Sequence, residues 1–337
     1  MTSRERVRRC VEFERPDRPP RDLWVLPLAE KLAGRQRIDE LRRRWPGDFT
    51  QSPGCRPAGR LVRGDPAAVG QFRDEWGCIF ENIQEGAHGE VKSPILDDWS
   101  KLEDVRPPRE LLEVDREAVN AFCRGTDKFV FASGWARPFE RVQFIRGSEN
   151  VFMDLAEDAP ELHELLRRVH GFFVEQYQVW AATEVDALVM MDDWGSQRSL
   201  LIHPEQWRRV FKPLYAQYVR IAHDHGKKFF MHCDGQIMDI YPDLVEIGVD
   251  AINSQLFCMD VEDLGRRFAG RITFWGEIDR QDILPRGSEA QVRAAVRRVV
   301  ENLWRPEGGA IAQFELTPGM PMENAEAVYD EWRRLTG

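Results

Sequence analysis

Short apolar runs recur along the chain and alternate with segments of helical periodicity. Seven of these runs are rich in β-branched and aromatic residues, which is typical of strands buried on both faces. Because a helical segment separates most successive runs, the pattern predicts parallel strands joined by right-handed crossovers. The predicted strands are "DLWVLP" (22–27), "KFVFASG" (128–134), "DALVMMD" (186–192), "KFFMHC" (228–233), "VDAINS" (249–254), "ITFWGEI" (272–278) and "AIAQFE" (310–315).

Three of the helical segments carry recognisable end signals. One follows Asp158, which is expected to cap it, and a second follows His203-Pro204, where Pro213 predicts a kink. A third begins at Ser288, which forms a capping box with Gln291. These helices supply the crossovers that a parallel sheet needs.

The alternation predicts an α/β fold, specifically a (β/α)8 TIM barrel in which one strand escapes the pattern. An open, doubly wound sheet is the alternative, although no GxGxxG motif follows a strand. Residues 50–127 interrupt the rhythm and are rich in Gly, Pro and acids, which predicts an insertion or lid over one mouth. We therefore expect a single domain over 1–337 with a decorated N-terminal region.

Composition narrows the class of protein. The chain has 337 residues, 42% of them hydrophobic and 31% charged, as expected for a soluble globular protein. Its formal net charge of −10 disfavours nucleic acid as a partner. No signal peptide and no membrane span is expected, and six scattered cysteines favour reduced thiols in the cytoplasm.

Titratable and amide side chains cluster at the ends of the predicted strands. In a parallel barrel the carboxyl ends of the strands carry the chemistry, and neighbouring strands lie about 5 Å apart. We therefore expect one cavity surrounded by the side chains that end successive strands, namely Asp192, Asp193, His232, Asp234, Asn253, Gln255, Glu277 and Glu315.

Alternation along a strand sorts these candidates. His232 and Asp234 share one face and Cys233 the other, so His232 with Asp234 is the better pair for a metal or a substrate, with a structural His–Asp pair as the alternative. One of Asp192 and Asp193 should point inward and move protons, while the other could cap a loop.

Aromatic residues near the strand ends suit the wall of a pocket for a flat or apolar substrate. We expect Trp24, Trp194 and Gln255 to line it. Ordinary core packing is the alternative for the two tryptophans.

Several longer motifs resemble the uroporphyrinogen decarboxylase (URO-D) superfamily, which includes cobalamin (corrinoid)-dependent methyltransferases. The resemblance implies a (β/α)8 barrel with a pocket at its C-terminal mouth. Its marks cover nearly the whole chain: "FERPDRPPRDLW", "PFERVQFIRGSENVFMDL", "MMDDWGSQRSLLIHPEQW", "FFMHCDGQIMDIYPDLVEIGVDAINSQ", "ITFWGEIDRQDILPRGS" and "MPMENAEAVYDEW".

The two branches of the superfamily imply different sites. The methyltransferases hold zinc with a His-x-Cys strand end and a later Cys, and these positions fall here on His232, on Asp234, and at Phe314 beside Glu315. Two soft ligands are replaced, and His232, Asp234 and Glu315 would form a zinc site richer in oxygen. The decarboxylases use an arginine-rich N-terminal loop whose pattern is absent from "RPDRPPRDLWVLPLAE".

The resemblance therefore implies a methyltransferase-like enzyme. It would transfer a methyl group between a small methylated or aromatic compound, a corrinoid or a thiol, with a corrinoid protein as partner. Asp192 or Asp193 and Glu277 would handle protons. The alternatives are a uroporphyrinogen decarboxylase-like lyase that uses carboxylates without metal, and a non-catalytic binder.

Overall fold

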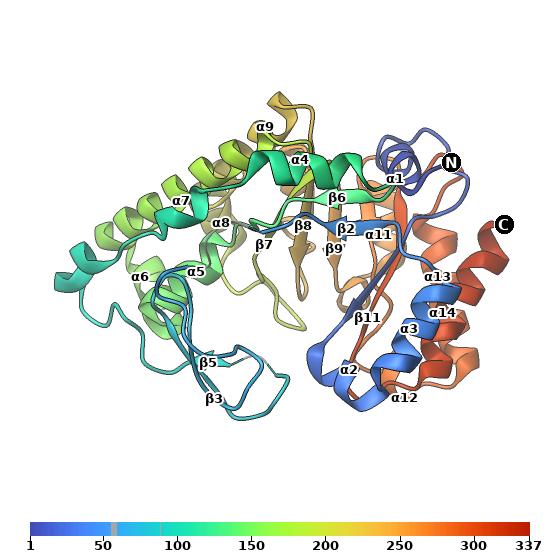
Figure 1. Ribbon diagram of the computed structural model, residues 1–337, viewed down its shortest axis with the longest axis horizontal. Coiled ribbons are helices and arrows are strands. Elements are labelled where there is room, and N and C mark those ends of the chain that lie inside the picture. Colours follow the sequence, from blue (N-terminus) through green and yellow to red (C-terminus); the bar gives the residue numbers. More distant parts are fainter. Residues whose placement is uncertain (55–58, 88) are drawn as a thin grey trace.

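Eight parallel strands curve into a barrel surrounded by helices, as predicted (Figure 1). The computed structural model describes residues 1–54, 59–87 and 89–337, so Cys55 lies outside the described part. The strands follow the order β1-β11-β10-β9-β8-β7-β6-β2 around the sheet. Their bounds are β1 (Arg21–Val25), β2 (Phe49–Gln51), β6 (Phe129–Phe131), β7 (Ala187–Met191), β8 (Lys228–Cys233), β9 (Ala251–Ser254), β10 (Thr273–Trp275) and β11 (Ala310–Leu316).

The strand that the sequence pattern missed is β2, which has only three residues. It pairs with β6 and lies at the start of the segment that interrupts the apolar rhythm. The backbone N–H of Asp48 donates to the carbonyl oxygen of Arg21 over 2.8 Å and so links the two end strands of the sheet. The buried Asp48 carboxylate also accepts from Arg6 and Arg18, which fixes this seam.

The barrel interior is a packed apolar core, closed at one end by α1 (Ser3–Val11). Val7 and Cys10 of α1 pack against inward-facing residues such as Phe129 and Phe230. Successive residues of a strand face opposite sides of the sheet. The residues that alternate with the inward-facing ones therefore pack in the outer core, between the sheet and the helices. This alternation decides which strand-end side chains reach the other, open mouth.

Helices cover the outside of the barrel, and their ends test the predicted caps. Ser288 and Gln291 form the predicted capping box, and the helical segment after His203-Pro204 divides at Phe211, just before Pro213. Asp158 does not cap the helix that follows it; it adopts a left-handed conformation and ends the preceding helix instead.

The helices are α2 (Pro27–Ala33), α3 (Arg35–Arg44), α4 (Arg116–Arg124), α5 (Pro138–Arg146), α6 (Ser148–Glu157), α7 (Pro160–Ala181), α8 (Pro204–Val210), α9 (Lys212–Asp224), α10 (Tyr241–Glu246), α11 (Val261–Phe268), α12 (Ile283–Arg286), α13 (Glu289–Leu303) and α14 (Met322–Thr336), with 3-10 turns η1 (Trp99–Asp104), η2 (Arg109–Leu112) and η3 (Leu256–Cys258).

The segment between β2 and β6 contains a separate antiparallel sheet, made of β3 (Gly70–Arg73), β4 (Ile79–Asn82) and β5 (Glu90–Val91). Buried Arg141 of α5 pairs with Asp74 and Glu75, which anchors this sheet to the barrel. The sheet and α2 flank the end of the barrel opposite α1 (Figure 1). A role as a lid stays a prediction.

No helix in the described ranges is long and apolar enough to cross a membrane. The five cysteines within those ranges are free thiols: Cys10, Cys78, Cys123, Cys233 and Cys258.

Candidate active site at the barrel mouth

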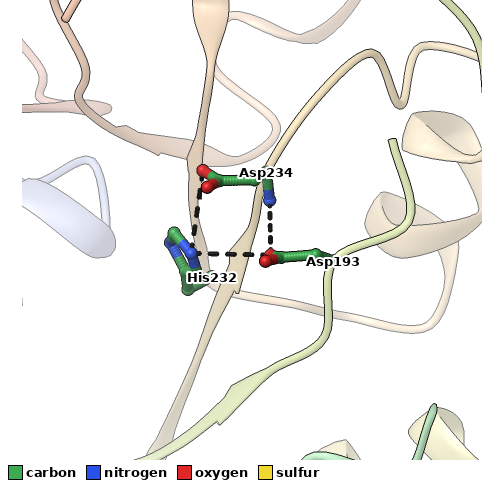
Figure 2. Close-up of side chains that lie close together, drawn as sticks. All are labelled: Asp193, His232 and Asp234. Carbon is green, nitrogen blue, oxygen red and sulfur yellow. Dashed lines mark hydrogen bonds and ion pairs between the residues drawn. The ribbon is translucent and has the colours of Figure 1, made fainter. Parts of the chain in front are cut away.

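Asp193, His232 and Asp234 converge at the open mouth (Figure 2). The Nε2 atom of His232 lies 3.6 Å from Oδ1 of Asp193 and 3.7 Å from Oδ1 of Asp234. The backbone N–H of Asp234 donates to Asp193 Oδ1 over 2.9 Å, which joins the ends of β7 and β8. We call these three residues the mouth triad.

A buried asparagine sets the proton position on His232. Asn253 Nδ2 donates to the carbonyl oxygen of Trp275, so the Asn253 Oδ1 atom, 2.6 Å from His232 Nδ1, must accept a proton from it. In the neutral imidazole the lone pair therefore lies on Nε2, which faces the two carboxylates. The imidazole is thus oriented as a ligand or as a proton acceptor.

Cys233 points away from the mouth, as the alternation along β8 predicted. Its side chain is fully buried, and its sulfur accepts from the backbone N–H of Trp194 over 3.4 Å. Burial raises the pKa of this thiol well above its usual value. The triad therefore offers one nitrogen and two carboxylates, without a thiolate.

Arg280, in the loop after β10, contacts three of the acids at the mouth. Its guanidinium pairs with Asp234, lies 2.9 Å from Glu315 Oε1 and lies 3.4 Å from Glu277 Oε1. Glu315 is therefore attached to Arg280, and it is Asp193 that completes the group around His232. The expected ligand set of His232, Asp234 and Glu315 stays untested, and the geometry favours the mouth triad over it.

Two of the acids around Arg280, Glu277 and Glu315, have pKa values above those of free carboxyls. Burial raises the pKa of Glu277 well above its usual value, and the neighbouring Asp234 and Glu315 carboxylates add to the effect. Burial also raises the pKa of Glu315, against the attraction of Arg280. Glu277, only 3% exposed, is thus a candidate acid or base next to the mouth.

Trp24 forms a wall beside the triad. Its ring centroid lies 5.2 Å from that of His232, and its Nε1–H donates to Asp22 Oδ2 over 2.9 Å. The same Asp22 oxygen accepts from Trp275 Nε1, and burial raises the pKa of Asp22 to about 6. Trp24 is partly exposed, so its indole is held in place where a substrate can meet it.

Asp192 and Trp194 lie apart from this group. The buried Asp192 carboxylate accepts from the backbone N–H groups of Phe139 and Glu140, at the start of α5, and from Tyr215 Oη over 2.6 Å. Trp194 is fully buried and stacks on Phe139 with centroids 3.8 Å apart. Both side chains face the layer between the sheet and the helices. For Trp194 this is the core packing that the sequence left open, whereas Asp192 binds the start of α5 and not the loop that follows it.

Gln255 lines a cavity of about 220 Å³ on the Arg280 side of the mouth. Its Oε1 atom accepts from the backbone N–H of Gly235 over 3.1 Å, which ties it to the residue after Asp234. Glu277 and Arg280 line the same cavity.

Two residues at the mouth were not singled out from the sequence. Arg280 is the basic residue of "GEIDRQD", directly after a strand end, and that position was its signal. Glu140 occupies the first turn of α5, where its Oε2 atom is buried without a hydrogen-bond partner. Burial raises the pKa of Glu140 to about 7, with Asp193 adding to and His232 opposing the shift.

One of three compared solved structures shares the whole barrel. A methyltransferase from Methanosarcina mazei superimposes with a TM-score of 0.70 over 99% of both chains, at 13% identity, which is a likeness of fold. The E. coli 3-keto-D-glucoside 4-epimerase YcjR, at 12% identity over 73% of this chain and 96% of its own, reaches a TM-score of only 0.40. The IOLI protein with a binding zinc atom, at 11% identity over 52% of this chain and 68% of its own, reaches 0.29.

Comparison by sequence identifies the family. No curated protein matches the chain. The family profile named Uroporphyrinogen decarboxylase (URO-D) matches residues 76–335, which include every strand from β4 onward and all members of the mouth triad. The chain therefore belongs to the uroporphyrinogen decarboxylase (URO-D) family.

Proposed function

We propose that the chain is an enzyme of the methyltransferase-like branch of the URO-D superfamily. It would transfer a methyl group between a small methylated or aromatic compound, a corrinoid or a thiol, at a divalent cation held by Asp193, His232 and Asp234. The observation that carries the proposal is the convergence of His232 Nε2 with the two carboxylates, at 3.6 Å and 3.7 Å.

The mouth triad fits a metal ion. Tetrahedral zinc with bonds of about 2.1 Å places its ligand atoms about 3.4 Å apart, close to the observed spacings. Asp234 Oδ1 is buried and makes no hydrogen bond within the described ranges, although it faces His232. An unpaired buried carboxylate oxygen is costly unless a cation or a donor satisfies it.

The donor set indicates the kind of metal. One imidazole nitrogen and two carboxylate oxygens suit Zn²⁺ and other borderline divalent ions, and they bind less softly than a thiolate set. A metal bound there would supply Lewis-acid polarisation of the reacting heteroatom or thiol. This choice of ligands follows the superfamily's His position and departs from its cysteines.

Residues of the chain would perform the remaining steps. Asn253 keeps the His232 lone pair on Nε2, and Trp24 forms the wall against which a substrate lies. Glu277, whose pKa burial raises well above its usual value, would act as the acid that gives a proton to the heteroatom from which the methyl group departs.

The test measures protein-dependent methyl transfer from methylcobalamin to 2-mercaptoethanol. The absorbance change of the corrinoid reports the transfer. Transfer that is lost in His232→Ala and Asp234→Ala, and retained in the surface variant His163→Ala, would support the proposal. Release of CO2 from uroporphyrinogen, equal in the wild type and in His232→Ala, would instead favour the metal-free decarboxylase.

A further inference from the structure

The cavity of about 220 Å³ next to the mouth triad has the size of a small ligand site. A water molecule takes up about 30 Å³ of liquid volume, so the space suits a molecule of a few heavy atoms. It adjoins the triad through Arg280, which lines the cavity and pairs with Asp234. Its occupant would therefore lie beside the proposed metal site.

Glu277 lines this cavity with a nearly buried carboxyl group. The side chain is 4% exposed, and no hydrogen bond from the described residues reaches either of its oxygens. Its one ion pair within those residues is the 3.4 Å contact between Oε1 and Arg280 Nε. Its other oxygen is thus a polar atom without a partner among the residues that the structure describes.

The charges around the cavity do not balance. Arg280 is the one basic side chain among the described residues that line it, and it contacts Asp234, Glu277 and Glu315 together. The cavity wall also holds the carboxylates of Asp279 and of Asp282, and Asp282 pairs with Arg286. One positive charge against these acids leaves room for a cation and disfavours an anion.

The remaining walls suit a ligand that carries methyl groups. Leu256 and Phe257 supply apolar surface. The Cys258 thiol donates to the amide oxygens of Gln197 and Gln255 over 3.1 Å and 3.2 Å, and burial raises its pKa. Cys258 is therefore a wall residue in its thiol form, and the carboxyl of Glu277 is the reactive group that faces the ligand.

We propose that this cavity binds a small methylated amine as its ammonium ion, with the N–H directed at the Glu277 carboxylate. This deepens the proposed function by naming its substrate class, and it rests on that function only for the chemistry that follows binding. The free amine takes the proton of the Glu277 carboxyl, which leaves an ammonium–carboxylate pair.

The transfer then balances without a further proton. The carbon–nitrogen bond to the methyl group breaks, its electron pair stays on nitrogen, and a thiolate or a reduced corrinoid supplies the pair for the new bond to the methyl carbon. The products are the demethylated amine and the methylated acceptor.

Binding can be tested by ligand-observed NMR titration of the whole chain with three compounds of similar shape. These are trimethylammonium, the neutral tert-butanol and the anionic trimethylacetate. We expect trimethylammonium to bind at least about tenfold more tightly than the other two, and Glu277→Gln to weaken it by about tenfold or more. Glu301→Gln, which alters an exposed glutamate of α13, should leave it unchanged.

Equal binding of tert-butanol, tighter binding of trimethylacetate, or unchanged affinity in Glu277→Gln would overturn the proposal. So would the absence of trimethylammonium binding to the wild-type chain. The comparison of the three compounds on wild-type protein does not depend on how well a variant folds. Because the titration is run on chelator-treated protein, its failure is distinct from failure of the metal-dependent methyl transfer.

Discussion

The Oδ1 atom of Asn253 lies 2.6 Å from Nδ1 of His232, at the end of a chain of hydrogen bonds that starts at the Trp275 carbonyl. This contact gives the imidazole a fixed tautomer and a fixed direction. Residues that orient a ligating histidine in this way commonly contribute about 10- to 100-fold to metal affinity.

Replacement of Asn253 should therefore weaken metal binding without removing a ligand. We expect Asn253→Ala to lower Zn²⁺ affinity by about 10- to 100-fold, measured by competition with a chromogenic chelator. Asn302→Ala is the matched control, because the side chain of Asn302 donates to the carbonyl oxygen of Arg298 in its own helix. Equal affinity in both variants would mean that Asn253 does not orient His232 for a metal.

Asp193 and Glu315 are rival third ligands, and the structure separates them. Asp193 faces His232 at 3.6 Å, whereas Glu315 accepts a bond of 2.9 Å from Arg280. We expect Asp193→Ala to reduce the bound metal below one ion per chain and Glu315→Gln to retain it, as measured by plasma mass spectrometry. The reverse pattern would restore the ligand set predicted from the sequence.

Asp192 should act on stability rather than on the site chemistry. Its carboxylate is buried and accepts from Phe139 N, Glu140 N and Tyr215 Oη. We expect Asp192→Ala to lower the free energy of unfolding by about 2–4 kcal/mol in urea titrations, because three donors lose their acceptor. The folded variant should keep its metal content despite the lower free energy of unfolding. A folded variant that lost its metal would instead show that Asp192 belongs to the site.

Glu140 gives the stability of the chain a definite pH dependence. Burial raises its pKa from 4.5 to about 7. Between these values the folded state binds more protons than the unfolded state, so the contribution of Glu140 is present below about pH 4.5 and is lost as the pH rises to about 7. Glu140→Gln should thus be more stable than the wild type by about 1–3 kcal/mol at pH 8.

Urea unfolding of metal-free protein at pH 4.5 and pH 8 checks this difference. The gain should appear at pH 8 and shrink toward pH 4.5, with Glu149→Gln, an exposed residue of α6, as the flat control. A stability difference of the same size at both values would show that Glu140 is ionised normally in the folded chain.

The barrel could be predicted from the sequence because most of its strands are continuous apolar runs. The two-residue alternation of a strand also correctly predicted that Cys233 points away from the mouth. β2 was missed because "FTQ" contains a single apolar residue and is not buried, whereas the equally short β6, "FVF", is apolar and buried throughout. The mouth was harder to predict because alternation gives the face of a side chain and not its partner. Arg280 donates a hydrogen bond to Glu315. Asp193 lies beside His232 because its carboxylate accepts from the backbone N–H of Asp234.

The positions of Asp192 and Trp194 were also not settled by their place at a strand end. Both were candidates for the site because they follow a strand end, yet each faces the outer layer. There Asp192 accepts a hydrogen bond at the start of α5, and Trp194 stacks on the ring of Phe139. Ala187 and Val189 of β7 face the barrel interior, so the same alternation, continued past the strand end at Met191, places Asp193 on the inner side and Asp192 on the outer side.

Anomalous diffraction from crystals of the zinc-loaded protein, recorded at the zinc absorption edge, tests the mouth triad most directly. We expect one peak per chain, about 2.0–2.2 Å from His232 Nε2 and from an oxygen of both Asp193 and Asp234. A peak elsewhere, or its absence from the mouth in protein that binds zinc stoichiometrically, would contradict it.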